Sequence, residues 1–256
     1  MKIIKNSELH NYVEKSLLDD FSPEQISGRV RTNEKNLPSI NKDAIYCFIK
    51  SIYGRKVEIY RRKQRQKRKP GKVKTEPLSD RVFIDKRPKY IQDRKRIGDV
   101  EADFIVSCKG GKGIILSLTD RKSRMTFLEK ISDVSIDNVH LAFQRIKMRF
   151  PELKTITTDN DILFRKHKEL ERLLGVKIYF CHPYHSWEKG TVENTNGLVR
   201  RYIPKGSDIS RYSKGFIRKI EEKLNRRPRK CLNYSTPNEI LERRRRLKKK
   251  KSECSD

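Results

Sequence analysis

The N-terminal part of the chain alternates apolar and polar residues with the period of a helix. Apolar or small residues recur every three or four positions, at Leu9, Tyr12, Val13, Ser16 and Leu17. This spacing predicts an amphipathic helix that buries one face.

Two further helices are predicted before residue 54. One begins at Pro23, because the Ser22 hydroxyl can accept a hydrogen bond from the first turn and proline suits the first helical position. After a turn from residue 33 to 38, Asn41 can cap the next helix, whose predicted buried stripe is Ile45, Phe48, Ile49 and Ile52. Two helices joined by a turn are compatible with a helix-turn-helix that places its second helix in the major groove. An ordinary helical hairpin is the alternative.

The middle of the chain has the pattern of strands, and then of alternating helices and strands. Apolar runs at 100–107, 113–118 and 124–131 predict three strands, with a hairpin turn at 109–112. Further along, helices are predicted at 139–150, 162–174 and 188–202, and strands at 153–158 and 176–180. This order predicts an α/β fold, with a mixed five-stranded sheet flanked by helices and preceded by a small all-helical domain.

These patterns divide the chain into four predicted parts. Residues 1–54 form the helix-turn-helix domain, 55–96 a basic linker, 97–242 the core and 243–256 a basic tail. A run of Arg and Lys such as that at 61–69 usually marks a solvated arm, and beside a DNA enzyme it would also follow phosphates.

Charge narrows the class of partner. The 256 residues include 62 Lys and Arg against 33 Asp and Glu, a formal net charge of +29. Because a compact chain with this imbalance repels itself, we expect a polyanion to neutralise it, and phosphate contacts make nucleic acid the expected partner. Composition alone does not separate DNA from RNA, so an RNA-binding protein is an alternative.

The cysteines and the apolar runs bear on the cellular compartment. The five cysteines include no C-x-x-C pair, which predicts reduced thiols rather than disulfides. Cys181, His182 and His185 have no second ligand pair at zinc-site spacing. No apolar stretch has membrane-spanning length and no secretory signal is recognisable, so we expect a cytoplasmic, nucleoid-associated protein.

Three acidic residues lie where the predicted elements come together. Asp103 is in the first strand among apolar neighbours, Asp159 follows the strand at 153–158, and Glu193 is on the helix at 188–202. Converging carboxylates in a basic protein suggest a divalent-metal site, because Mg²⁺ prefers hard oxygen ligands. Two such ions can stabilise the attacking and leaving oxygens of an in-line displacement. Each acid taken alone is more simply a surface ion-pair partner.

The chain resembles the DDE transposases of bacterial insertion sequences, specifically the IS-thirty group. The resemblance runs from about residue 21 to 242, and its most specific segment is YFCHPYHSWEKGTVENTNGL at 179–198. The interval of 33 residues between Asp159 and Glu193 is also that of the family. Further matching segments are 21–29, 96–103, 120–124, 224–232 and 236–239.

The resemblance implies a ribonuclease H-like integrase core that cleaves transposon ends and joins them to target DNA. It implies Asp103, Asp159 and Glu193 as catalytic residues and ligands of Mg²⁺, with Mn²⁺ as a substitute and two ions in the site. It also implies a homo-oligomer on double-stranded DNA, since transposases pair two ends. The family normally carries another N-terminal helical unit, and an inactive DNA-binding relic or regulator of transposition is therefore the alternative.

Several other residues are expected to serve the site. Asn196 and Arg200 share a helix face with Glu193, and we expect both to contact DNA. Lys189, just before that helix, is expected to meet a phosphate, and Lys42 is expected to contact DNA from the second helix of the helix-turn-helix. Trp187 could stack on DNA or wedge the helix, and packing is the favoured interpretation.

Two further acids compete for the metal site. Glu101 shares a strand face with Asp103, so it is the rival ligand if the register differs. Asp161 stands where the family commonly has glycine, and it could alter the affinity for the ion or replace Asp159 as a ligand.

Overall fold

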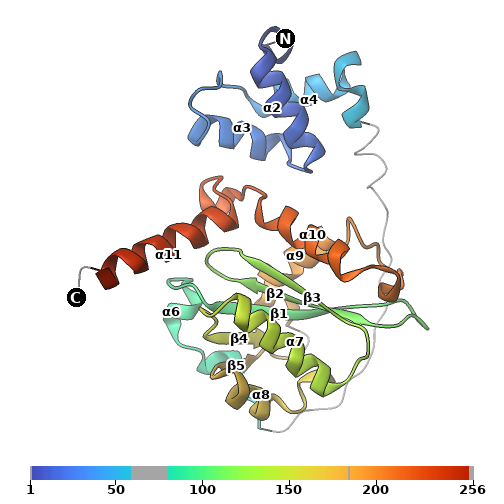
Figure 1. The fold of residues 1–256 in the computed structure, drawn as a ribbon, viewed down its shortest axis with the longest axis vertical. Helices are drawn as coiled ribbons and strands as arrows, with labels where there is room; N and C mark the ends of the chain where they lie inside the picture. Colours follow the sequence, from blue (N-terminus) through green and yellow to red (C-terminus); the bar gives the residue numbers. More distant parts are fainter. Residues whose placement is uncertain (1, 59–79, 184, 254–256) are drawn as a thin grey trace. The chain divides into compact units, whose positions relative to one another are not determined.

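A computed structural model describes residues 2–58, 80–183 and 185–253 (Figure 1). The chain divides into two compact units, one formed by residues 1–67 with 225–256 and the other by residues 68–224. Residues 225–242, which the sequence analysis assigns to the core, are thus grouped with the helical N-terminal residues. Among the described residues, no helix is both long enough and apolar enough to cross a membrane.

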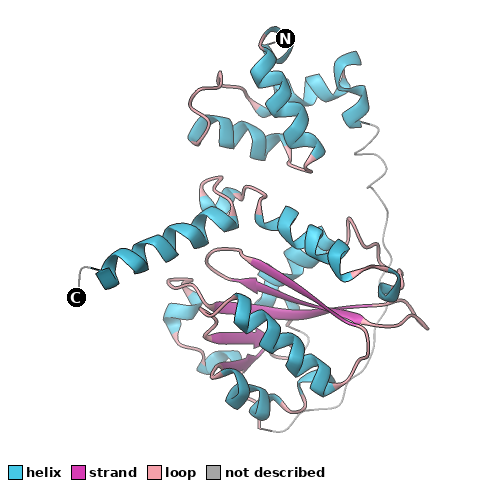
Figure 2. Ribbon diagram, in the orientation of Figure 1, coloured by secondary structure: helices cyan, strands magenta, loops and turns pink. Residues whose placement is uncertain are grey.

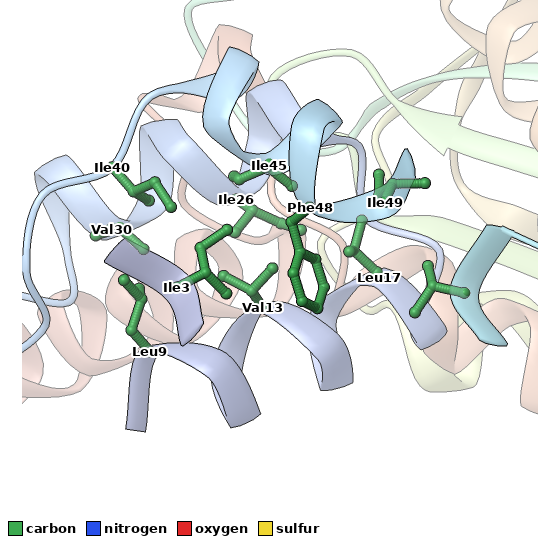
Figure 3. Packing of buried hydrophobic residues seen from close by; sticks show 11 residues of the cluster. Ile3, Leu9, Val13, Leu17, Ile26, Val30, Ile40, Ile45, Phe48 and Ile49 are labelled. Carbon is green, nitrogen blue, oxygen red and sulfur yellow. The ribbon is translucent and has the colours of Figure 1, made fainter. Parts of the chain in front are cut away.

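The helical unit begins with α1 (Lys2–Lys5), α2 (Ser7–Leu18), α3 (Pro23–Thr32) and α4 (Lys42–Lys50). The predicted caps are present: Ser22 Oγ accepts from the Gln25 amide and Asn41 Oδ1 from the Ala44 amide. Figure 3 shows the buried side chains of these helices meeting in one core. Ile52 is the exception to the predicted stripe, because α4 ends at Lys50 and leaves Ile52 87% exposed in η1 (Ile52–Gly54).

The same unit contains the C-terminal elements η6 (Lys230–Leu232) and α11 (Pro237–Glu253). Arg29 on α3 donates to both carboxylate oxygens of Glu239 on α11, at 3.1 and 2.6 Å. Gln25 Nε2 donates to the Pro228 carbonyl oxygen at 2.8 Å. These contacts join segments that lie about two hundred residues apart in the sequence.

The second unit is built on a five-stranded sheet with the order β3-β2-β1-β4-β5 (Figure 2). Its strands are β1 (Asp99–Val106), β2 (Ile114–Asp120), β3 (Thr126–Ile131), β4 (Thr155–Thr158) and β5 (Lys177–Phe180). The first three strands are antiparallel neighbours, whereas β4 pairs parallel with both β1 and β5. The predicted mixed sheet is therefore confirmed.

Helices cover both faces of this sheet. On one face, Ile105 and Leu128 pack with side chains of α9 (Gly190–Val199) and α10 (Lys214–Asn225). On the other face, Phe127 contacts Phe150, which follows α7 (Ile136–Arg149). Phe104 contacts Phe164 of η3 (Ile162–Phe164), and η3 leads to α8 (His167–Leu174). Successive residues of β1 point to opposite faces, so Glu101, Asp103 and Ile105 lie on the side of α9.

Residues that the sequence analysis places in the linker also have regular structure. They include η2 (Ile84–Lys86) and α6 (Lys89–Gln92), and Phe83 forms a parallel bridge with Phe180 at the β5 edge. The predicted helix at 188–202 is instead a 3-10 turn, η4 (Ser186–Lys189), followed by α9, and a further turn, η5 (Ile209–Arg211), precedes α10.

Candidate active site

Parallel pairing of β1 with β4 places two of the three predicted acids side by side on neighbouring strands. The register pairs Asp99 with Thr155 and Glu101 with Thr157. Continuing this register by two residues sets Asp103 beside Asp159, at the carboxyl end of β4. This is the end of a parallel strand where α/β sheets place their ligand sites.

The ammonium of Lys189 lies between these two carboxylates. Its Nζ donates to Asp103 Oδ1 at 2.9 Å and to Asp159 Oδ2 at 2.7 Å, and its side chain is only 5% exposed. Burial by itself would lower the pKa of Lys189, but the charges of Asp103 and Asp159 outweigh that effect and raise it above its ordinary value. The lysine therefore remains a cation.

Helix α9 presents a second donor to Asp103. Asn196 Nδ2 donates to Asp103 Oδ2 at 2.7 Å, so both oxygens of this carboxylate are engaged. Burial raises the pKa of Asp103, and Lys189 opposes that rise. Glu193 is exposed on α9, three residues before Asn196 and four after Lys189. Since residues three and four apart share a helix face, Glu193 belongs to the side of α9 that meets Asp103.

Glu101 has a different set of contacts from Asp103. It is 1% exposed; its Oε1 accepts from Arg121 Nε at 3.1 Å, and its Oε2 accepts from the amides of Thr191 and Val192 at 2.8 and 3.0 Å. A carboxylate at this position satisfies the unpaired amides of the first turn of α9 and complements the helix dipole. Glu101 thereby fixes the start of the helix that carries Glu193.

The two other acids near the site also have structural contacts. Asp99 accepts from Arg96 Nε at 2.9 Å and from the Thr155 hydroxyl at 2.7 Å. Asp161 Oδ1 accepts from the Leu163 amide at 2.9 Å, which caps η3. Burial raises the pKa of Asp161, and the charge of Asp159 adds to this rise.

The oxygen atoms of the site fit a hard divalent cation. Asp159 Oδ1 is buried and has no hydrogen-bond partner among the described residues, although the whole side chain is 44% exposed. A buried oxygen without a donor is costly unless a cation or water satisfies it. Asp103 and Asp159 offer carboxylate oxygens, the ligands that Mg²⁺ prefers, whereas Glu193 does not join them in a group of ligand atoms within 4.8 Å among the described residues. The pair of aspartates is already arranged around one positive charge, that of Lys189.

No protein-family model matches the chain, whereas several individual proteins resemble it over most of its length. The transposase of insertion sequence element IS4351 from Bacteroides fragilis is 40% identical over 231 residues, which cover 88% of this chain and 70% of that protein. The transposase of IS1086 from Cupriavidus metallidurans is 33% identical over 251 residues, 94% of this chain and 74% of that protein. The chain belongs to the IS30 family of insertion-sequence transposases.

Two further comparisons accompany this assignment. Transposase InsI of IS30A from Escherichia coli is 33% identical over 257 residues, 93% of this chain and 66% of that protein. Among solved structures, the catalytic core domain of BIV integrase has a TM-score of 0.45 and 18% identity, and the match covers 59% of this chain and 97% of that domain.

A histidine cluster lies directly before α9 of the transposase. His182, His185 and Glu188 offer ligand atoms within 4.8 Å of one another. His182 Nδ1 faces Glu188 Oε1 at 2.9 Å and His182 Nε2 faces Asp85 Oδ2 at 2.7 Å, and the hydrogen bond to Glu188 is the main cause that raises the pKa of His182. Burial raises the pKa of the neighbouring Cys181 thiol to about 12, which disfavours the thiolate that zinc requires.

The remaining predicted DNA-contact residues are dispersed in the transposase. Arg200 follows α9 and donates to the carbonyl oxygens of Val106 and Pro204, at 3.1 and 3.4 Å. Lys42 is exposed at the start of α4. Trp187 is 69% exposed in η4, so it does not pack into the core as the favoured interpretation expected.

Sequence reasoning did not foresee that Lys189 would bridge the aspartates or that three arginines would gather in one pocket with Glu101. Arg87, Arg94 and Arg121 line one pocket. Arg121 lies in the segment 120–124 that carries part of the family resemblance, which was the one available signal. Arg87 and Arg94 fall in the segment interpreted as a linker. Because that whole segment is basic, nothing in the sequence distinguished these two arginines from the others.

Proposed function

We propose that this transposase cleaves the ends of its insertion sequence and joins them to target DNA through metal-dependent phosphoryl transfer. Asp103, Asp159 and Glu193 are the proposed catalytic carboxylates and the ligands of Mg²⁺, or of Mn²⁺ as a substitute. The observation that carries the proposal is that Asp103 lies beside Asp159 on neighbouring strands. The side of α9 that bears Glu193 is the side that faces Asp103.

The chain supplies positioning and charge for this reaction. When bound, divalent ions polarise the phosphate and activate the attacking water or hydroxyl, and a pair of ions serves both attacking and leaving oxygens. Asn196 holds one oxygen of Asp103 in place at 2.7 Å, which orients the other toward Asp159. Glu101 fixes the first turn of α9 and so positions Glu193. Such preorganisation lowers the entropic part of the barrier.

Lys189 is proposed to pass from the aspartates to the DNA. Asp103 and Asp159 would hold a divalent ion only where Lys189 no longer occupies the space between them, because the ammonium repels a second cation. Its flexible stem would then reach a phosphate oxygen close to the scissile bond, where a point charge is useful. The predicted phosphate contact of Lys189 would thus form after its ammonium leaves the aspartates.

DNA binding by the rest of the chain is proposed on charge and exposure. The net charge of +29 provides the electrostatic affinity for a duplex. Lys42, Trp187, Asn196 and Arg200 are the proposed contact residues, with Lys42 on the helical unit as part of a DNA-reading surface. Residues 33–41 join α3 to α4, a longer connection than the usual three or four residues of a helix-turn-helix. A homo-oligomer that pairs two ends is proposed as well.

Cleavage of labelled duplex that carries the ends of the element tests the proposal, with wild type and Asp103→Asn compared in Mg²⁺. We expect the variant to bind duplex with unchanged affinity and to lose at least about a hundredfold in cleavage rate. Asp137→Asn is the matched control, since Asp137 is exposed on α7, which packs on the opposite face of the sheet. Tight, salt-sensitive binding without any cleavage by wild type would instead support the relic or regulator.

A further inference from the structure

A polar pocket is lined by residues between 84 and 190, among them Glu101 of β1. Its volume is about 650 Å³, within the usual range for small-ligand sites. The lining includes Arg87, Arg94, Arg121, Glu101 and Trp187. Three arginines and an indole in one concavity are the side chains that recognise phosphate and stack on bases.

The acids in the lining already have partners. Glu101 pairs with Arg121 and the α9 amides, and Asp85 and Glu188 both pair with His182. Arg87 has no ion pair among the described residues, although the charges of Glu101 and Asp99 act on it from farther away. Arg87 is 6% exposed, and the hydrogen bonds that its guanidinium makes to described residues go to neutral oxygens of Thr157 and Gln92.

Arg87 also has an unsatisfied donor. Its Nε is buried without a hydrogen-bond partner among the described residues. Burial, and then the charge of Arg121, lower its pKa to about 10, against the opposing charge of Glu101. An anion entering the pocket would compensate the charge of the guanidinium.

Trp187 provides an aromatic surface at the same pocket. It is the single tryptophan of the chain and is 69% exposed. Its ring contacts that of His185, with centroids 4.4 Å apart and an angle of 37° between planes. An exposed aromatic surface beside clustered arginines is typical of sites that bind unpaired nucleotides.

The position of the pocket relates it to the proposed reaction. Glu101 lines the pocket and lies on β1 two residues before Asp103, on the same face, a step of about 7 Å. In a duplex each nucleotide of a strand advances about 3.4 Å along the axis, and an unpaired strand extends further, so this step is at most about two nucleotides. A nucleotide next to the cleavage point is thus within reach.

We propose that this pocket binds one unpaired nucleotide of the DNA substrate, with its base on Trp187 and its phosphate at the arginines. The inference rests on the proposed function, because it assigns part of the same DNA substrate. Extruding a base costs least at a frayed or single-stranded end. The pocket therefore favours ends with an unpaired nucleotide over fully paired duplex.

The fluorescence of Trp187 tests this directly, because no other tryptophan contributes. Wild type is titrated without divalent metal with a duplex that has a short single-stranded overhang, and with a blunt duplex of equal phosphate number. We expect the overhang to quench Trp187 and to bind about tenfold more tightly, the difference corresponding to one stacked base. Trp187→Ala, followed by anisotropy of labelled DNA, should lose this preference.

A pair of arginine variants separates the pocket from general charge. Arg94→Asn should weaken overhang binding more than blunt binding, because Arg94 is exposed at the pocket and asparagine tolerates its positive φ of 54°. Arg172→Asn removes the same charge from exposed α8, near the start of β5, and should affect both DNAs equally.

Two negative results have different meanings. The protein could bind both duplexes equally, show unchanged Trp187 fluorescence and still cleave ends in Mg²⁺. That result would overturn nucleotide binding at the pocket and leave the proposed function standing. Failure to bind either duplex would contradict both.

Discussion

Lys189 donates a hydrogen bond of 2.9 Å to Asp103, joining the residue before α9 to the middle of β1 across 86 positions of sequence. The same ammonium reaches Asp159 at 2.7 Å. Two carboxylates held this close repel each other, and the buried cation between them compensates that repulsion. The arrangement of the site therefore depends on Lys189 as well as on the acids.

Lys189→Met should destabilise the protein in metal-free buffer. Removing one partner of a buried ion pair typically costs about 3–5 kcal/mol, and we expect about 3 kcal/mol because Asp159 is 44% exposed. Mn²⁺ should stabilise the variant more than wild type, since the ion no longer competes with the ammonium. Urea unfolding with and without Mn²⁺ measures both effects.

The control for this prediction is Lys166→Met. Lys166 pairs with Glu169 at 3.7 Å on the surface, so its loss should cost less than about 1 kcal/mol and should not change the effect of Mn²⁺. Equal Mn²⁺ stabilisation of wild type and Lys189→Met would show that the lysine does not occupy the ion's place.

Glu101→Gln should reduce stability, and it should weaken Mn²⁺ binding much less than Asp103→Asn does. The substitution removes the charge that faces buried Arg121 and the α9 amides, and it should cost about 3 kcal/mol or more. Calorimetric titration with Mn²⁺, at a temperature where the variant is folded, separates this role from ligation. A loss of Mn²⁺ affinity as large as that of Asp103→Asn would make Glu101 a ligand.

Much of the sheet could be predicted because its signals are local. The apolar runs predicted the strands to within a few residues, and Gly175, with a φ of 61°, follows α8 at the point where the predicted helix 162–174 ends. The position of Asp159 after a strand was predictable for the same reason. Ile52 was wrongly assigned to the core because periodicity continues past Lys50, where the helix itself stops.

The contacts that complete the site were not predictable because they are long-range. The bond of Asn196 to Asp103 spans 93 positions, and a single sequence does not reveal such a pairing. The exposure of Trp187 follows from the 3-10 turn η4, which replaces the predicted start of the helix. Apolar character alone had favoured packing.

Low pH should selectively weaken the ion pair between Arg29 on α3 and Glu239 on α11. The hydrogen bonds from Arg29 lower the pKa of Glu239 to about 2, from an ordinary 4.5. A carboxyl group whose pKa is lowered on folding stabilises the fold above its ordinary pKa, and this contribution is lost as the pH falls from 4.5 toward 2. Glu239→Gln should therefore cost about 1–2 kcal/mol at pH 7 and little near pH 2.

Urea unfolding followed by circular dichroism, at several pH values, measures this difference. Glu242→Gln is the control, because Glu242 is 63% exposed and lies 3.6 Å from Arg246 on the surface. A cost of Glu239→Gln that stays constant across the acid range would show that the ion pair is not its cause.

The most direct test of the proposed chemistry is cleavage of labelled end-bearing duplex by wild type and Glu193→Gln, in Mg²⁺ and in Mn²⁺. Glu193 is exposed on α9, so the substitution should leave the fold and DNA affinity intact. We expect metal-dependent nicking by wild type and its loss in Glu193→Gln in both metals. Nicking by Glu193→Gln at the wild-type rate would contradict the assignment of the three carboxylates.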